Sequence, residues 1–329
     1  MIKILGLGNA LVDVMVTIPG DELLDHFNLT KGSMQHVGRK VFDDVLASVR
    51  DFKQVVTSGG SAANAIHGLA SLGNQTAFIA KVGRDTLGDF FLNDMITNGI
   101  EPRFLRTDTE TGIAVTLISP DGERTFAVYL GAAIELSADD MGNELFRGFD
   151  ILHIEGYLVQ NHELIETALK IAKHNGLKVS LDMASFNVVE DNLEFLLRIV
   201  RDYIDIIFAN EQEALAFTGC EPEEALAVFA NQCEIAVVKT GANGSLIQQG
   251  QQVYKIDAIS AHLIDTTGAG DVYAAGFLHG IINNLPLAQC GKIGALLAGN
   301  VIGNLGAKIP QNKWEDIRKQ IAMIYISSC

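Results

Sequence analysis

The chain has 329 residues, of which 48% are hydrophobic, and its mean hydropathy is +0.22. This composition supplies a sizeable packed core and excludes an intrinsically disordered chain. With 24 Lys and Arg against 40 Asp and Glu, the formal net charge is −16, which disfavours binding to nucleic acid or to an anionic membrane surface. An anionic ligand is not excluded, because backbone amides at the start of a helix bind phosphate without any net positive charge.

The cysteines and the N-terminal residues indicate the compartment. The four cysteines, Cys220, Cys233, Cys290 and Cys329, show no CxxC pairing and no His at zinc-ligand spacing, so we expect free thiols in a reducing compartment. The first residues, "MIKILGLGNALVDVMV", are typical of a strand and not of a signal peptide, and no segment has the apolar length of a membrane span. We expect a cytoplasmic protein without nucleic-acid or membrane partners, either a monomer or a homodimer.

Short β-branched runs alternate with amphipathic runs along most of the chain. Buried strands are predicted at 76–83, 150–158, 177–183, 204–210 and 234–240. A helix is predicted over 161–176, where basic residues and then Gly176 provide a stop signal. Strands and helices that alternate at this spacing predict an α/β fold with a mostly parallel sheet covered on both faces.

Two stretches depart from this alternation and predict a small separate sheet. Residues 11–40 alternate apolar and polar positions without a convincing helix pattern, and residues 101–133 contain strand-like runs joined by a turn at "SPDGER". Only six prolines and no Ser/Pro-rich linker are present, which disfavours two tethered domains. We therefore expect a single domain over 1–329, with a discontinuous β lid formed by about 11–40 and 101–133.

The stretch "DTTGAGD", residues 265–271, precedes a run with apolar residues at helical spacing. Its glycines leave the amides of Ala269, Gly270 and Asp271 unobstructed at a helix start, which is an arrangement that binds anions. Asp271 could accept a proton from an attacking hydroxyl; the helix dipole favours its ionised form, so we expect a weak base, sufficient for phosphoryl transfer. An acidic first turn that only stabilises its helix is an equally good interpretation of these residues alone.

The stretch "SGGSAANA", residues 58–65, is a second candidate. Gly59 and Gly60 precede Ser61, which we expect to cap a helix of small residues. The paired glycines and Asn64 could admit a ligand close to the backbone and bind its hydroxyls. Close packing of a helix on a sheet explains the same small residues, and on this stretch alone it is the favoured interpretation.

Two further stretches follow predicted strands. In "NEQE", Asn210 and Glu213 lie three residues apart at a strand end, where oxygen ligands suit a hard cation bound to phosphate. In "KTGANGS", the turn of Thr240, Gly241 and Gly244 could seat a nucleotide. A solvated acidic helix start and an ordinary hairpin turn are the plainer interpretations.

Several common catalytic motifs are missing from the sequence. There is no GxxxxGK[ST], no HExxH and no GxSxG, so a P-loop enzyme is excluded and the usual zinc-protease and hydrolase patterns are not met. "GLGNAL" is only half of a dinucleotide fingerprint. The eight histidines are scattered and fit structural or exposed positions better than catalytic ones.

Taken together, these stretches resemble the ribokinase (pfkB-type) family of sugar and nucleoside kinases. "DTTGAGD" resembles the C-terminal signature of that family, "GGSAANA" its N-terminal signature, and "NEQE" its Asn-x-x-Glu magnesium motif, in the same order along essentially the whole chain. The resemblance implies a three-layer ribokinase-like α/β core with a small β-sheet lid. It also implies transfer of the γ-phosphate of ATP to a primary alcohol, with Mg²⁺.

The resemblance assigns roles to particular positions. It implies that Asp271 is the catalytic base and that the backbone of Gly268, Ala269 and Gly270 is the anion hole. Substrate hydroxyls would be bound by Asp13, Gly59, Gly60 and Asn64, and the nucleotide by Thr240, Gly241 and Gly244. Asn210 and Glu213 would organise Mg²⁺ through water, and Asp265 and Thr267 match the positions that hold a monovalent cation such as K⁺.

The acceptor is open at this point. "GNALVDV" and "YLGAAIELSADD" resemble the adenosine-kinase branch, whereas Thr267 is the form more common in sugar kinases. We expect phosphorylation of adenosine to AMP; a kinase for ribose, fructose or a related sugar is the alternative, and a non-catalytic nucleotide- or sugar-sensing protein on the same fold is a second alternative. For Arg124 an exposed hairpin position is expected, in preference to a contact with phosphate, and for Tyr157 a core position is expected, in preference to stacking on a purine.

Overall fold

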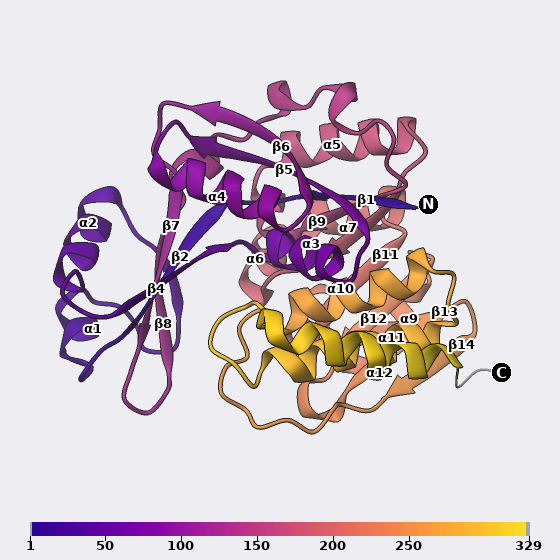
Figure 1. Ribbon diagram of the computed structural model, residues 1–329. Coiled ribbons are helices and arrows are strands. Elements are labelled where there is room, and N and C mark those ends of the chain that lie inside the picture. Colours follow the sequence, from indigo (N-terminus) through magenta and orange to yellow (C-terminus); the bar gives the residue numbers. More distant parts are fainter. Residues whose placement is uncertain (1, 327–329) are drawn as a thin grey trace.

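The computed structural model describes residues 2–326, and Figure 1 shows a large α/β body with a smaller sheet standing beside it. The body is built on a sheet with strand order β14-β13-β12-β11-β10-β9-β1-β5-β6, in which the strands from β12 to β6 are parallel and β13 and β14 are antiparallel. The strands are β1 (Lys3–Leu7), β5 (Gln75–Gly83), β6 (Ile100–Thr107), β9 (Ile151–Glu155), β10 (Lys178–Asp182), β11 (Ile206–Asn210), β12 (Ile235–Lys239), β13 (Ser245–Gln249) and β14 (Gln252–Ile256).

Helices cover both faces of the large sheet. One face packs against α3 (Ser61–Ser71), α4 (Thr86–Thr97), α10 (Ala269–Ile282), α11 (Leu287–Val301) and α12 (Trp314–Ile326). The other face packs against α5 (His162–His174), α6 (Phe186–Asp191), α7 (Leu193–Tyr203), α8 (Glu211–Thr218) and α9 (Pro222–Ala230). The inner strands, such as β1, β9 and β11, are buried on both faces, which explains why they are continuous apolar runs in the sequence.

The predicted three-layer α/β fold is confirmed, with small changes at element ends. All five predicted strands are present, and the predicted helix 161–176 is α5. The strand predicted at 150–158 ends at Glu155, and a 3₁₀ turn over Gly156–Gln160 follows it. At Gly156 the backbone passes so close to Asp182 and Met183 that a Cβ would lie 2.6 Å from the carbonyl oxygen of Asp182.

The smaller sheet has the order β3-β8-β7-β2-β4. Its strands are β2 (Leu11–Thr17), β3 (Met34–His36), β4 (Gln54–Gly59), β7 (Gly112–Ile118) and β8 (Arg124–Tyr129). The predicted turn at "SPDGER" is confirmed, because β7 and β8 pair antiparallel on either side of it. Helices α1 (Glu22–His26) and α2 (Arg39–Ser48) share an apolar core with this sheet.

The predicted boundaries of the small sheet were wrong at two places. Residues 100–107 form β6, which pairs parallel with β5 at the edge of the large sheet, and residues 54–59 form β4 of the small sheet. The segment 11–40 also contains α1 and the start of α2, for which no helix was predicted. An edge strand with one exposed side alternates in the same way as a hairpin strand, so the pattern does not reveal which sheet it joins.

Short 3₁₀ turns occupy several connections. They span Gly131–Glu135, Ala138–Asp140, Asn143–Leu145, Gly156–Gln160, Gly241–Asn243 and Gln311–Lys313. Within residues 2–326, no helix has both the length and the apolar character that crossing a membrane requires.

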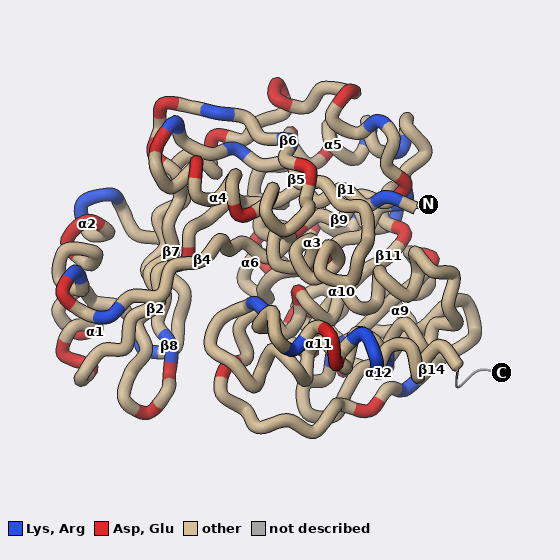
Figure 2. Tube along the Cα trace, in the orientation of Figure 1, with Lys and Arg blue, Asp and Glu red and all other residues tan. Residues whose placement is uncertain are grey.

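The excess of acidic residues is distributed over the whole molecule. Figure 2 shows Asp and Glu on the small-sheet side and on the α/β body, with Lys and Arg interspersed among them. A ligand that carries phosphate therefore has to be held by local donors, because the overall field of a chain with net charge −16 repels it.

Candidate active site

A cavity of about 1150 Å³ lies where the small sheet meets the carboxyl-end edge of the large sheet. Strands β9, β10, β11 and β12 are parallel, so their last residues reach the same edge. These residues are Glu155, Asp182, Asn210 and Lys239, and all four line the cavity. Residues of β2, β3, β7 and β8 close it from the other side.

Helix α10 points its N-terminus at this cavity. Gly268 is its N-cap with φ of +74°, a conformation that glycine adopts without strain, and both Gly268 and Gly270 line the cavity. The first bond along the helix runs from the amide of Val272 to the carbonyl of Gly268, which leaves the amides of Gly270 and Asp271 without a partner inside the helix. The amide of Ala269 is turned back to the carbonyl of Thr266, so it is already used. Of the amides expected to bind an anion, that of Ala269 is therefore not available, and those of Gly270 and Asp271 stay candidates for this role.

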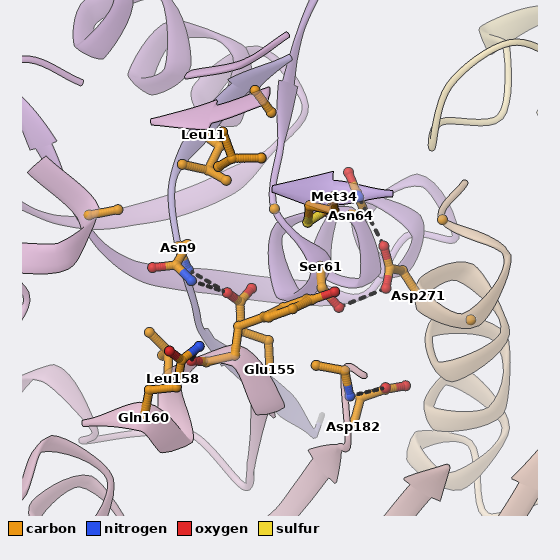
Figure 3. A pocket seen from close by; sticks show the side chains of 18 of the residues that line it. Asn9, Leu11, Met34, Ser61, Asn64, Glu155, Leu158, Gln160, Asp182 and Asp271 are labelled. Carbon is orange, nitrogen blue, oxygen red and sulfur yellow. Dashed lines mark hydrogen bonds between the residues drawn. The ribbon is translucent and has the colours of Figure 1, made fainter. Parts of the chain in front are cut away.

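Asp271 is held in place by helix α3. Its Oδ1 accepts a hydrogen bond from Ser61 Oγ at 2.7 Å and its Oδ2 accepts one from Asn64 Nδ2 at 2.9 Å (Figure 3). Burial raises the pKa of Asp271 to about 6, although the bonds from Asn64 and Ser61 lower it. Asp271 is therefore a stronger base than the helix dipole alone suggested, and it is suited to take a proton near neutral pH.

Ser61 does not cap α3, contrary to our expectation. The N-cap is Gly60, at φ of +104°, and Ser61 is the first helical residue. A Cβ at Gly60 would clash with the carbonyl oxygen of Asn9, so only glycine fits where the backbone of β4 enters the helix. Ser61 is consequently free to donate to Asp271, which is a role that the sequence pattern did not indicate.

Glu155, at the end of β9, joins the segment after β1 to the start of α3 at the cavity. Its Oε1 accepts bonds from the Asn9 backbone at 3.0 Å and from Asn9 Nδ2 at 2.6 Å (Figure 3). Its Oε2 accepts a bond from the Ala62 amide at 2.9 Å. Burial raises the pKa of Glu155 to about 7. Sequence reasoning missed this residue, because a lone Glu at the end of a buried strand carries no recognisable motif.

Lys239 is the second functional residue that sequence reasoning missed. Its Nζ donates to Asp182 Oδ2 at 2.8 Å, and a Cβ at Gly270 would lie 3.0 Å from the same Nζ. Burial opposes the charge on Lys239, but the neighbouring carboxylates, first of all Asp182 and Glu213, outweigh it and raise the pKa of the amine. A fixed positive charge therefore lies beside the helix start where phosphate oxygens would be bound.

Asn210 and Glu213 form a reciprocal capping box at the start of α8. Glu213 Oε2 accepts from the Asn210 amide at 2.7 Å, Glu213 Oε1 accepts from Asn210 Nδ2 at 2.6 Å, and the Glu213 amide donates to Asn210 Oδ1 at 2.9 Å. Burial raises the pKa of Glu213 to about 7, while Lys239 lowers it. Both residues line the cavity, but each Glu213 oxygen already accepts one bond.

The predicted nucleotide turn is only partly at the cavity. Gly241 lines it, whereas Thr240 and Gly244 close the turn behind it through a bond of 2.8 Å from the Thr240 amide to the Gly244 carbonyl. Gly244 has φ of +92°, and a Cβ there would clash with the carbonyl oxygen of Ile256. Thr240 and Gly244 thus shape the turn, and Gly241 and Lys239 face the space beside it.

The cavity is also lined by three of the four predicted hydroxyl-binding residues. Asp13 on β2 and Gly60 and Asn64 line it, and a Cβ at Gly59 would clash with the carboxylate of Asp13. Burial raises the pKa of Asp13 to about 7, while Lys308 lowers it. Asn64 Oδ1 is buried without a hydrogen-bond partner among the described residues, while its Nδ2 is bonded to Asp271.

Arg124 is buried, contrary to our expectation of an exposed hairpin residue. It reaches from β8 to the "DTTGAGD" loop, where its Nη1 pairs with Asp265 Oδ1 and donates to Thr267 Oγ1 at 3.3 Å. The amides of Thr267 and Gly306 donate to the same carboxylate at 2.8 and 2.5 Å. Since a guanidinium already neutralises Asp265, these residues do not fit a monovalent cation, and we do not retain the K⁺ prediction.

Comparison with known proteins identifies the family. The family of pfkB carbohydrate kinases matches residues 33–314. The chain belongs to the pfkB kinase family. Members of this family phosphorylate sugars or nucleosides with ATP, so the protein is an ATP-dependent kinase, and the alternative of a non-catalytic sensor is set aside.

Individual relatives of this pfkB kinase include sugar and nucleoside kinases. It is 28% identical over 248 residues to an uncharacterised sugar kinase of Archaeoglobus fulgidus, covering 73% of this chain and 96% of the relative. Among solved structures, it is 33% identical to a probable sugar kinase of Rhizobium etli, with a TM-score of 0.89 and coverage of 98% and 99% of the two chains. It is also 33% identical to adenosine kinase of Sinorhizobium meliloti, with a TM-score of 0.87 and coverage of 97% and 99%.

Proposed function

We propose that this pfkB kinase transfers the γ-phosphate of ATP to a primary hydroxyl of a nucleoside, with adenosine as acceptor and AMP as product. The observation that carries the proposal is that one part of the cavity lining is polar and another part is apolar. Beside the polar groups of Asp13 and Asn64, apolar side chains of the small sheet and of the turn after it face the same space. They are Leu11, Phe126, Val128, Leu130, Ile134 and Leu136. A ribose fits the polar wall, and a flat purine fits the apolar wall.

The residues support a direct transfer. Asp271 takes the proton of the acceptor hydroxyl while the oxygen of that hydroxyl forms a bond to the γ-phosphorus of ATP. The bond between the γ-phosphorus and the bridging oxygen of the β-phosphate breaks, and ADP is released. The Gly270 amide and the start of α10 stabilise the oxygens of the transferring group, and Lys239 adds a positive charge beside them. Tyr157 packs against the core, as the sequence suggested, and it also lines the same cavity, so we propose that its ring can in addition stack on the purine.

We also propose that Mg²⁺ acts with the nucleotide and is organised through water by Asn210 and Glu213. The described residues include no group of three or more His, Cys, Asp or Glu side chains arranged to hold a metal, and the Glu213 oxygens already accept bonds from Asn210. This donor set fits a metal that arrives on the phosphates and keeps its waters. When bound, Mg²⁺ would neutralise phosphate charge.

Glu213→Gln should raise the magnesium concentration that gives half-maximal rate, because an amide removes the negative charge while keeping the size of the side chain. The measurement is the initial rate against magnesium concentration at saturating ATP. Glu223→Gln on α9, where the side chain is exposed, is the matched control and should leave the curve unchanged. If the dependence of the rate on magnesium concentration is unchanged in Glu213→Gln as well, Asn210 and Glu213 serve only to cap α8.

A sugar kinase is the second candidate, supported by the sugar-kinase relatives and by Thr267 in "DTTGAGD". A substrate panel separates the two. We expect kcat/KM for adenosine to exceed those for ribose and fructose, and 2′-deoxyadenosine to be phosphorylated much less efficiently than adenosine because one hydroxyl partner is lost. Rapid turnover of a free sugar without turnover of adenosine would contradict the proposal. A cytoplasmic location and the oligomeric state stay predictions.

A further inference from the structure

A partly buried polar cluster lies at the end of β4, outside the residues that line the cavity. Lys308 Nζ donates to Asp94 Oδ2 at 2.9 Å and also to Ser58 Oγ, and Ser58 Oγ in turn donates to Asp94 Oδ2. Ser58 is 1% exposed, and the side chains of Lys308 and Asp94 are 18% and 25% exposed. Three segments far apart in the chain meet here: the end of β4, helix α4 and the segment that precedes α12.

The cluster is adjacent to Asp13 through strands β2 and β4. Ser58 pairs with Val12 across the β2–β4 ladder, and the next residue, Gly59, lies against the Asp13 carboxylate. Lys308 is the cation that lowers the pKa of Asp13. Asp271 on α10 raises the pKa of Asp13, Asp94 offsets the charge of Lys308, and burial lowers the pKa of His67 on α3 to about 4, so that His67 is neutral at physiological pH. His36 on β3 lines the same cavity.

We infer that Lys308 is a positioning residue of the acceptor site: it clamps the end of β4 to α4 through Ser58 and Asp94, and it supplies the positive charge that keeps Asp13 able to accept two hydroxyl donors. This inference rests on the proposed role of Asp13 in binding the acceptor. Lys308 lies outside every motif recognised in the sequence. The inference is that it controls the affinity for the acceptor but not the affinity for ATP.

Opposite shifts in two variants test this inference. Burial already raises the pKa of Asp13 to about 7, so acceptor affinity falls as pH decreases through that value and Asp13 becomes protonated. Lys308→Met removes the charge that lowers this pKa, so the loss of affinity should begin at higher pH. Asp94→Asn removes the carboxylate that offsets Lys308, so the loss should begin at lower pH.

The measurement is the dissociation constant of the acceptor by calorimetry between about pH 5 and about pH 9, without ATP. At neutral pH, Lys308→Met should raise the dissociation constant of the acceptor by about tenfold, because a larger fraction of Asp13 is protonated and no longer accepts both hydroxyl bonds as a charged group. The KM for ATP should stay unchanged. Lys308→Arg keeps the charge and should restore the wild-type pH profile. Lys319→Met is the matched control, because Lys319 is exposed on α12 and pairs with Glu315 at 2.7 Å.

The outcomes separate this inference from the proposed function. The acceptor used is the one that the wild type phosphorylates fastest in the substrate panel, so a preference for a sugar contradicts the adenosine proposal and leaves this test intact. Shifts in the same direction for Lys308→Met and Asp94→Asn, or no shift in either, would show that the cluster only stabilises the fold. If Lys308→Met does not fold, Asp94→Asn and Lys308→Arg still decide the direction.

Discussion

Asp271→Asn lowers kcat by about 10²- to 10⁴-fold and changes the KM for ATP by no more than a few-fold. The amide keeps the size of the side chain and a bond to Ser61 or Asn64, but it cannot accept a proton from the acceptor hydroxyl. Wild-type kcat should itself fall below about pH 6, the value to which burial raises the pKa of Asp271, because the base is then protonated. In the variant this acid limb should be absent.

The same substitution should stabilise the protein at alkaline pH. A carboxyl whose pKa is raised in the folded state contributes stability below its unfolded pKa, and that contribution is lost as pH rises through the folded value of about 6. The Tm of Asp271→Asn should thus exceed that of the wild type near pH 8, with a smaller difference near pH 5. Asp316→Asn, on the exposed side of α12, is the matched control for both readouts. Retention of most of the activity would show that Asp271 is only the acidic first turn of its helix.

Asp13→Ala raises the KM for the acceptor by at least about tenfold and leaves the KM for ATP close to that of the wild type, because each hydroxyl left without a buried partner costs roughly 1–3 kcal/mol. Asp13 lines the cavity from β2 of the small sheet, whereas Lys239 and Gly241 line it from the end of β12 in the large sheet. Loss of the side chain also leaves Lys308 paired to Asp94, so no buried charge is abandoned.

Two controls make the effect of Asp13→Ala specific. Asp44→Ala removes an exposed carboxylate from α2 on the same small sheet and should change neither KM. In the Asp13→Ala variant, the preference for adenosine over 2′-deoxyadenosine should largely disappear, since the partner of the missing hydroxyl is gone. A lower Tm with an unchanged acceptor KM would mean that Asp13 only supports the strand.

The body of the fold was predictable from the sequence because its elements are locally determined. Continuous apolar strands such as 204–210 and the amphipathic helix at 161–176 carry their periodicity in adjacent residues. The glycines of "DTTGAGD" and "SGGSAANA" were recognisable for the same reason, since a positive φ at Gly268 and Gly60 requires glycine wherever the chain turns that tightly.

What only the tertiary structure decided is which distant residues meet. The sheet that β4 and β6 join depends on pairing across the chain, and exposed alternation looks the same in either sheet. The bonds of Ser61 and Asn64 to Asp271 span 210 and 207 residues, and that of Lys308 to Asp94 spans 214. The burial of Arg124 and the desolvation of Lys239 and Asp271 likewise follow from packing, and it is desolvation that raises the pKa of Asp271 to about 6. The sequence by itself determined the elements and the kind of chemistry, because these depend on local periodicity and residue type. The partners of each charged group and its pKa depend on desolvation and on contacts between distant segments, so they arise only when the chain is folded.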